Sequence, residues 1–236
     1  MPASVTAFPA MARCFVTRML PGADLERLRA AHEVDLWPKP GPPSYGELLA
    51  RTEEADGLLC MLTDRVDAEL IAACERLRAI SNYAVGTDNV DVGAATARGI
   101  PVGNTPDVLT DSTADLAVAL MLAIARRIND GERVVRAGEW RTWGPSFLLG
   151  RDLHGATVAI VGAGRIGTAV ARRLEGFECE VLFIGRDDHD RLDSLLGRAD
   201  FVSIHTPLSD QTRGLIGEAA LRAMKPTAHL VRGNLG

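Results

Sequence analysis

The sequence predicts an α/β protein in which two sets of parallel strands are separated by a long helix. Short apolar runs alternate with helical runs between residues 13 and 102, and again between residues 157 and 231. Alternation of this kind is typical of parallel sheets with helices on their faces. The length of 236 residues leaves room for one or two domains.

Composition excludes several classes of protein. A hydrophobic fraction of 47% and a charged fraction of 24% exclude a disordered chain, a coiled coil and a collagen. A net charge of −5 leaves no general basic surface, so we expect no nucleic-acid partner. No run of about 18 apolar residues is present, which predicts no membrane span.

The start of the chain and its cysteines indicate a cytoplasmic protein. Residues 1–10 lack the basic start and apolar core of a secretory signal, and Met11 is an alternative start. The cysteines are far apart in the sequence and form no CxxC pair, so we expect buried thiols, no disulfide and no metal site. These cysteines are Cys14, Cys60, Cys74 and Cys179.

In the first half, the apolar pattern predicts strands and helices in alternation. The expected strands are 14–17, 34–37, 56–62, 77–81 and 100–102, and the expected helices are 23–31, 44–50, 67–74 and 91–98. Ser44 is expected to cap the second of these helices. Residues 110–135 then read as one long helix, with Thr110 or Ser112 as its cap.

In the second half, the same alternation resumes. Strands are expected at 157–161, 180–184, 201–204 and 228–231, and helices at 164–174, 192–196 and 218–224.

The sharpest motif is GAGRIG, in which Gly162, Gly164 and Gly167 form a GxGxxG pattern between a strand and a helix. Gly162 permits a tight turn, Gly164 lets the backbone approach a pyrophosphate, and Gly167 lets helix and strand pack closely. The free N–H groups at the start of the helix then bind phosphate. The motif predicts a dinucleotide site, and the alternative is an ordinary strand-to-helix turn.

The end of the next strand indicates which dinucleotide is bound. A carboxylate there would accept a hydrogen bond from the ribose 2′-hydroxyl of NAD. The sequence has Gly185 followed by Arg186, which favours the 2′-phosphate of NADP, although Asp187 and Asp188 come next and weaken that preference. The alternatives are NAD as the cofactor and Arg186 as a solvated surface residue.

The sequence resembles the D-isomer-specific 2-hydroxyacid dehydrogenase family, and within it the glyoxylate/hydroxypyruvate reductase branch. The matching stretches cover most of residues 55–226 and occur in the family's order. They are DGLLCMLTDRVD, SNYAVGTDNVDV, RGIPVGNTPDVLTDSTADLA, RAGEWRTWGPSFLLGRDLHGATVAIVGAGRIG and ADFVSIHTPLSDQTRGLIGEAALRAMKP.

The resemblance implies a flavodoxin-like substrate domain (residues 11–107) and a Rossmann NAD(P)-binding domain (residues 108–236), with the active site in the cleft between them. It also implies a homodimer built on residues 108–150, which contain Trp140 and Trp143. Trp143 would lie near the partner's substrate site or serve only as an interface anchor. The expected partner molecule is a small 2-keto or 2-hydroxy acid.

The resemblance also assigns roles to individual residues. The backbone amides of Val85 and Gly86 would bind the substrate carboxylate, and the alternative is a purely structural turn. The cofactor would be held by a larger set, in which Arg165 and Ile166 lie at the pyrophosphate. That set is Thr113, Gly162, Gly164, Arg165, Ile166, Gly167, Arg186, Thr206 and Pro207.

The sequence departs from the family pattern in its catalytic residues. The family's acid/base histidine and the carboxylate that holds it correspond to positions beyond residue 236, and His205 matches a strand-end motif instead. The family's substrate-orienting arginine matches Arg232 if three residues are deleted, and Leu235 if none are. These departures indicate a C-terminally shortened chain and favour little or no turnover.

A second departure shortens the segment between Arg186 and Phe201, where the family has a further helix and strand. This departure removes the third strand of the Rossmann order, and the family's sixth strand corresponds to positions beyond residue 236. The expected sheet therefore has four strands in the order 2-1-4-5, with exposed edges. Two functions remain open: reduction of glyoxylate or hydroxypyruvate by NAD(P)H, and dinucleotide binding or dimerisation without catalysis. A third reading keeps the enzyme class but changes the substrate, for example to 3-phosphoglycerate or phosphite.

Overall fold

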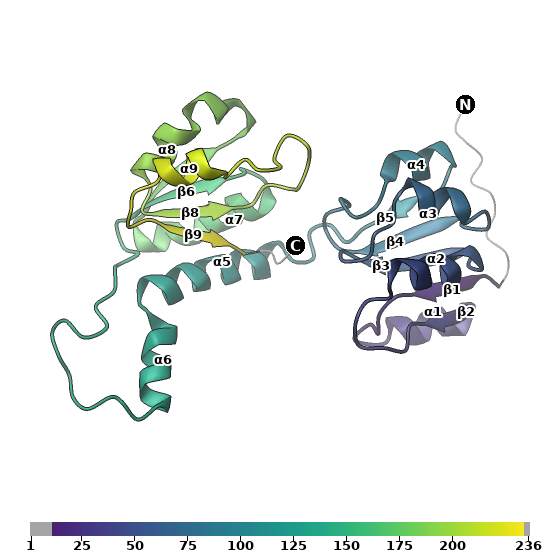
Figure 1. The fold of residues 1–236 in the computed structure, drawn as a ribbon, viewed down its shortest axis with the longest axis horizontal. Helices are drawn as coiled ribbons and strands as arrows, with labels where there is room; N and C mark the ends of the chain where they lie inside the picture. The colour runs from purple at the N-terminus through teal and green to yellow at the C-terminus, as the bar shows by residue number, and fades with distance from the viewer. Residues whose placement is uncertain (1–10, 234–236) are drawn as a thin grey trace. The chain divides into compact units, whose positions relative to one another are not determined.

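The computed structural model describes residues 11–233, which form two compact units that meet in sequence at Pro106 and Asp107 (Figure 1). Within the described residues, no helix is both long enough and apolar enough to cross a membrane. Three of the four cysteines are buried as expected, whereas Cys179 is only half-buried, and all four are free thiols.

The first unit is a five-stranded parallel sheet in the order β2-β1-β3-β4-β5. This 2-1-3-4-5 order is the flavodoxin-like order that the resemblance implied. The elements are β1 (Arg13–Val16), α1 (Asp24–Ala31), β2 (Glu33–Leu36), α2 (Tyr45–Glu53), β3 (Gly57–Met61), α3 (Ala68–Ala73), β4 (Ala79–Tyr83), α4 (Val92–Ala97) and β5 (Val102–Gly103).

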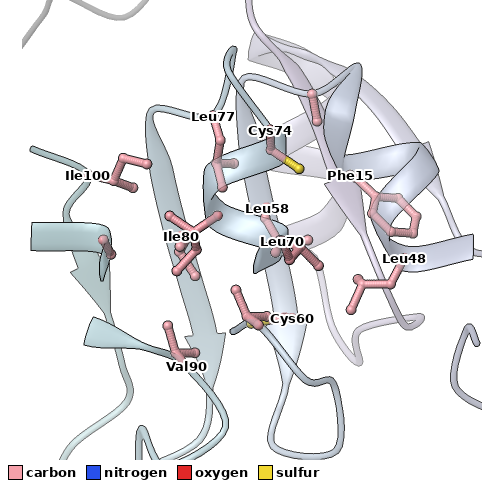
Figure 2. Close-up of a cluster of buried hydrophobic side chains, with 14 of the residues drawn as sticks. Phe15, Leu48, Leu58, Cys60, Leu70, Cys74, Leu77, Ile80, Val90 and Ile100 are labelled. Carbon is pink, nitrogen blue, oxygen red and sulfur yellow. The ribbon is translucent and has the colours of Figure 1, made fainter. Parts of the chain in front are cut away.

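The core of this unit joins the sheet to helices α2, α3 and α4 (Figure 2). Phe15, Leu58 and Ile80 come from the strands, and Leu48 and Leu70 from the helices. Local signals fix where these helices begin. The predicted cap of α2 is confirmed, because Ser44 and Glu47 form a reciprocal capping box in which the Ser44 N–H donates to Glu47 at 2.8 Å.

The second unit contains a four-stranded parallel sheet in the order β7-β6-β8-β9, which confirms the expected 2-1-4-5 order. Its helices and strands are α5 (Thr110–Ala125), α6 (Ile128–Arg136), β6 (Thr157–Val161), α7 (Arg165–Leu174), η1 (Glu175–Phe177), β7 (Glu180–Ile184), η2 (Arg186–Arg191), α8 (Leu192–Arg198), β8 (Phe201–Ile204), α9 (Glu218–Ala223) and β9 (His229–Arg232).

Four helices of the second unit cover both faces of its sheet (Figure 1). Helices α5 and α7 share one buried cluster with Val158, Ile160 and Phe201, whereas α8 and α9 share another with Ala159 and Val202. Alternate residues of β6 and β8 therefore point to opposite faces, as a strand requires. The first glycine of the GxGxxG motif directly follows this doubly covered β6.

The prediction of one long helix over residues 110–135 is wrong, because the helix is broken between α5 and α6. Arg127 has a left-handed backbone (φ 53°). The returning chain binds the end of α5, since the Arg151 N–H donates to the carbonyl of Ala125 at 2.7 Å. Gly150 packs so closely on that carbonyl that a Cβ would lie 2.3 Å from its oxygen. This tertiary contact ends the helix in place of a local stop signal.

The expected side-chain cap of α5 is also wrong. The capping position is Leu109, which offers no side-chain acceptor to the helix. Ser112 instead donates its hydroxyl to the Leu109 carbonyl at 3.2 Å. A serine one turn inside a helix can make this backward bond, so its presence near the helix start did not fix the cap.

Candidate cofactor and substrate sites

The turn after β6 is built on a glycine that no other residue replaces without strain. Gly162 has φ +104°, and a Cβ there would lie 2.8 Å from the backbone carbonyl carbon of His205. His205 directly follows β8, and its N–H donates to the Val161 carbonyl at 2.8 Å. The ends of β6 and β8 therefore meet at this turn, on either side of the point where the strand order reverses. Ligands of open α/β sheets bind at such switch points.

The third glycine of the motif sets the distance between α7 and β6. A Cβ at Gly167 would lie 2.1 Å from the Gly162 carbonyl oxygen and 3.0 Å from Cγ2 of Ile160. Only glycine allows this approach, which aims the first turn of α7 along the end of the strand.

The middle glycine of the motif, Gly164, faces open space, and a bound dinucleotide needs that space for its pyrophosphate. A Cβ at Gly164 would meet no protein atom within 4 Å. Within residues 11–233, the backbone N–H groups of Arg165 and Ile166 have no hydrogen-bond acceptor, and no side chain caps α7. Free N–H groups and the positive end of the helix dipole at one open turn form an anion site. The GxGxxG residues thus fit the pyrophosphate of a dinucleotide.

A surface cavity of about 430 Å³ lies beside this turn, between the starts of α5 and α7. Its lining includes Thr110, Gly164 and Thr168. The guanidinium of Arg165 is held at the same edge by Asp107, 2.5 Å away. Because that salt bridge is exposed, its stabilising free energy is small, but it sets the direction of the Arg165 side chain.

The structure gathers more of the predicted residues at the carboxyl edge of the second sheet. Thr206 follows His205, and Arg232 lies beside Ile204 at the end of β9. The next residue, Gly233, packs against α5, since a Cβ there would lie 3.5 Å from Cβ of Ala117 and 3.7 Å from the Thr113 carbonyl. Pro207 is exposed and its carbonyl accepts a hydrogen bond from Thr212 at 2.6 Å.

His205 is held as a structural residue at this edge. Its Nε2 lies 2.8 Å from the hydroxyl of buried Ser203, and burial lowers the pKa of the imidazole. The neutral imidazole is therefore favoured, and it has no carboxylate partner among residues 11–233. These contacts agree with the interpretation of His205 as part of a strand end.

The end of β7 presents Arg186 to solvent. Arg186 begins the 3₁₀ turn η2, and within residues 11–233 its guanidinium has no hydrogen-bond or ion-pair partner. Asp188, by contrast, is committed to the fold: its carboxylate accepts the Gly185 N–H at 2.9 Å and lies 3.6 Å from Arg191. The Asp188 carboxylate is thus engaged, while the guanidinium of Arg186 is available to an anion.

In the first unit, Val85 and Gly86 lie in a loop that follows β4. Their carbonyls are both bound by asparagine side chains: Asn104 donates to Val85 at 2.8 Å and Asn82 donates to Gly86 at 2.9 Å. Their N–H groups have no acceptor within residues 11–233. Adjacent free N–H groups in a turn bind anions such as carboxylates.

Sequence reasoning did not identify Asn82, Asn104 or Asp188 as parts of these sites. The sequence signal that could have identified the two asparagines is their position at strand ends. Asn82 lies near the end of β4, and Asn104 directly follows β5, the neighbouring parallel strand. Parallel neighbours bring their carboxyl ends to one edge. The sequence shows Asp188 only as a charge near the cofactor, because its bond to Gly185 depends on the turn η2.

The segment with the two tryptophans projects from the second unit. In Figure 1, α6 and the chain that returns from it extend away from the sheet of this unit. None of the side chains of α6 is buried, and the returning chain carries Trp140 and Trp143, which are 56% and 78% exposed. Phe147 and Leu149 on the same return are also exposed. Several exposed aromatic and aliphatic side chains on one projecting segment are typical of an interface.

Comparisons with known proteins agree with these features. Residues 118–235 match the family model described as D-isomer specific 2-hydroxyacid dehydrogenase, NAD binding domain. The chain is 46% identical to a glyoxylate reductase of Korarchaeum cryptofilum and 44% identical to one of Thermococcus kodakarensis. These alignments cover 95% and 93% of this chain, and 71% and 70% of the relatives. A crystal structure of a Thermus thermophilus protein matches with a TM-score of 0.85 at 45% identity, over 93% of this chain and 73% of that one.

Proposed function

This chain belongs to the D-isomer-specific 2-hydroxyacid dehydrogenases, an oxidoreductase family with an NAD-binding domain, and we propose that it uses NADPH to reduce glyoxylate or hydroxypyruvate. The observation that carries the proposal is the glycine turn, in which Gly164 leaves open space before the unpaired N–H groups of Arg165 and Ile166. The names of the relatives support glyoxylate as the substrate.

Different residues of the second unit would bind different parts of the cofactor. The turn from Gly162 to Gly167 would bind the pyrophosphate, and Arg186 would bind the 2′-phosphate of NADP in preference to NAD. Thr206 and Pro207 would lie along the ribose and nicotinamide, and Thr113 would approach the cofactor from the start of α5. When bound, NADPH supplies the hydride that reduces the keto carbon.

The substrate would be held by its carboxylate. The N–H groups of Val85 and Gly86 would donate to the carboxylate oxygens, and Arg232 would orient the keto group. These assignments follow the family resemblance and the free donors of the loop.

A second candidate function, NADPH binding without turnover, is favoured by the histidines. Catalysis in this family is expected to need a histidine held by a carboxylate. Among the described histidine side chains, His32 accepts the Ala12 N–H, His205 contacts Ser203, and the ring of His229 packs at a tilt against that of Phe201. None of them, nor His154, is bonded to a carboxylate within residues 11–233.

We also propose a cytoplasmic homodimer. The four cysteines are free thiols, as in proteins of reducing compartments. The exposed apolar surface of α6 and its return segment, within residues 108–150, would be covered by a second copy.

The test is NADPH oxidation at 340 nm with glyoxylate and hydroxypyruvate, with NADH in parallel and NADPH fluorescence measured on the same protein. Turnover that prefers NADPH supports the reductase. Fluorescence enhancement without turnover supports the second candidate. The absence of both turnover and fluorescence enhancement would contradict the proposed cofactor site.

A further inference from the structure

Three successive peptide groups of the loop after β4 are fixed through their carbonyl oxygens. The Ala84 carbonyl accepts the Thr105 N–H at 2.9 Å. The Val85 carbonyl accepts Nδ2 of Asn104 at 2.8 Å, and the Gly86 carbonyl accepts Nδ2 of Asn82 at 2.9 Å. Each carbonyl belongs to the same planar unit as the next residue's N–H.

This planarity links the carbonyl bonds to the direction of the donors. In a trans peptide the N–H points away from the carbonyl, so fixing the three oxygens aims the N–H groups of Val85, Gly86 and Thr87 to the opposite side. None of these three N–H groups has an acceptor within residues 11–233. The loop therefore presents consecutive unpaired donors, a backbone arrangement that binds anions.

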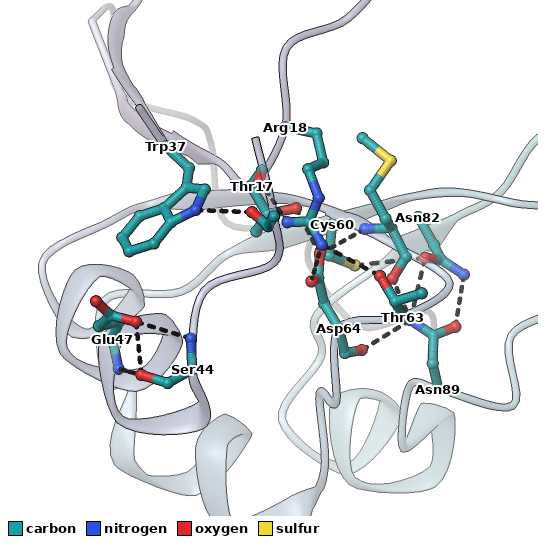
Figure 3. A network of polar contacts seen from close by, with 12 residues as sticks. Thr17, Arg18, Trp37, Ser44, Glu47, Cys60, Thr63, Asp64, Asn82 and Asn89 are labelled. Atoms are coloured by element: carbon teal, nitrogen blue, oxygen red, sulfur yellow. Dashed lines mark hydrogen bonds and ion pairs between the residues drawn. The ribbon is translucent and has the colours of Figure 1, made fainter. Parts of the chain in front are cut away.

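The two asparagines differ in how firmly they are held. Asn82 is fully buried, and its Oδ1 accepts Nδ2 of Asn89 at 3.2 Å and Sγ of Cys60 at 3.4 Å. Asn89 in turn donates to the carbonyls of Met61 and Asp64, each at 3.0 Å (Figure 3). The Asn82 amide thus cannot rotate without breaking buried hydrogen bonds.

Asn104, by contrast, is exposed and follows β5. Its bond crosses from the end of β5 to the loop of β4, which is the next strand in the sheet. Neither the sheet ladder nor the core requires an asparagine at this exposed position. The side-chain amide of Asn104 is instead used to bind the Val85 carbonyl of the loop.

We propose that Asn82 and Asn104 are positioning residues that aim the N–H groups of Thr87 and Gly86 at the carboxylate of the substrate. This inference rests on the proposed role of the loop in binding a 2-keto acid. It adds Thr87 to the donors and gives each asparagine a separate peptide to control: Asn104 fixes the Gly86 N–H, and Asn82 fixes the Thr87 N–H.

The test uses the ¹⁵N-labelled full chain without cofactor, titrated with oxalate, a carboxylate analogue that cannot be reduced. In the wild-type chain, oxalate should shift the amide signals of Val85, Gly86 and Thr87 saturably. Asn104→Ala should raise the Kd of oxalate about tenfold, the size of one lost orienting hydrogen bond. It should also lower the order parameter of the Gly86 amide more than that of Thr87.

Gln211→Ala is the matched control, because Gln211 is an exposed side-chain amide in the other unit and lies outside residues 108–150. This variant should leave the oxalate titration unchanged. Asn82→Ser should have its main effect on the Thr87 amide. Because that variant removes a buried amide, its spectrum must first show the dispersion of a folded chain, and Asn104→Ala gives a result in either case.

The outcomes separate the inference from the function on which it rests. If oxalate leaves all three wild-type amides unshifted, the proposed substrate loop is wrong and the inference falls with it. If oxalate binds the wild-type loop and Asn104→Ala binds it equally well, only the positioning role is overturned. Loss of NADPH binding in Asn104→Ala would also contradict a role confined to the loop.

Discussion

The carbonyl oxygen of Gly162 occupies the space that a side chain at Gly167 would need, since a Cβ there would lie 2.1 Å away. A Cβ at Gly164, two residues from Gly162, would meet no protein atom within 4 Å. The close approach at Gly167 therefore determines how α7 packs on β6, whereas the space at Gly164 is open to a ligand. Substitutions at the two positions therefore have different consequences.

We predict that Gly167→Ala lowers the free energy of unfolding by at least about 2 kcal/mol, because the methyl group meets backbone that cannot move aside. Gly164→Ala should leave stability unchanged within about 1 kcal/mol, because its φ of −78° suits an L-residue. Gly164→Ala should nevertheless raise the Kd of NADPH at least tenfold. Urea unfolding and NADPH fluorescence measure the two effects.

Each of the two glycine variants has an outcome that would contradict the prediction. If Gly164→Ala is stable and binds NADPH as tightly as the wild-type chain, the pyrophosphate does not lie at this turn. If Gly167→Ala is as stable as the wild-type chain, α7 can shift away from β6 without cost.

A second prediction concerns the choice of cofactor. Arg186→Ala should raise the Kd of NADPH about 10- to 100-fold, because a charge-assisted bond to phosphate contributes about 1.5–3 kcal/mol. The Kd of NADH should change less than about twofold by the same reasoning, since NADH has no 2′-phosphate. Fluorescence titrations with both dinucleotides check this.

Arg222→Ala is the control for charge, because Arg222 is exposed on α9 and paired with Glu218 at 2.7 Å. It should change neither affinity. Equal losses of NADH and NADPH affinity in Arg186→Ala would show that Arg186 supports the turn η2 rather than the 2′-phosphate.

Most of the parallel architecture was predictable because each strand carries its own signal. The runs at β6, β7 and β8 are apolar, β-rich and bounded by turn residues, and their predicted limits coincide with Thr157–Val161, Glu180–Ile184 and Phe201–Ile204. The glycine motif was readable because each glycine has a local backbone reason. Periodicity and turn chemistry are properties of short segments, so one sequence suffices to show them.

The features that were missed depend on residues far apart in the sequence. The break at Arg127 has no adjacent glycine or proline, and it results from Gly150 and Arg151 returning to the Ala125 carbonyl. The roles of Asn82 and Asn104 depend on the sheet order that makes β4 and β5 neighbours. A single sequence does not show which carbonyl a distant side chain reaches.

A third prediction concerns pH and His205. Burial lowers the pKa of this histidine in the folded chain, whereas the unfolded chain titrates near 6.5. The unfolded state therefore binds more protons as the pH falls below about 6.5, and the folded chain loses stability in that direction. The contribution of His205 is complete above the unfolded pKa and declines as the pH falls towards the folded pKa.

His205→Gln should therefore flatten the decline of the free energy of unfolding between about pH 7 and pH 5. Urea unfolding at several pH values measures this slope. His154→Gln is the control, because His154 lies exposed in a turn before β6 and should keep the wild-type slope. Parallel curves for wild type and His205→Gln would show that His205 titrates alike in both states.

The last prediction concerns the apolar surface of the projecting segment. Trp140 and Trp143 are 56% and 78% exposed in the single chain, on a return segment that follows a helix with no buried side chain. Exposed tryptophans cost solvation free energy in a monomer, and aromatic anchors at the centre of an interface contribute about 2 kcal/mol or more each. We therefore expect a dimer by light scattering, and a monomer for the double variant Trp140→Ser, Trp143→Ser at the same concentration.

Leu221→Ser is the matched control, because Leu221 is 50% exposed on α9, outside residues 108–150, and its substitution should leave the dimer intact. A wild-type monomer at all concentrations would contradict the proposed interface, and so would a double variant that remains a dimer.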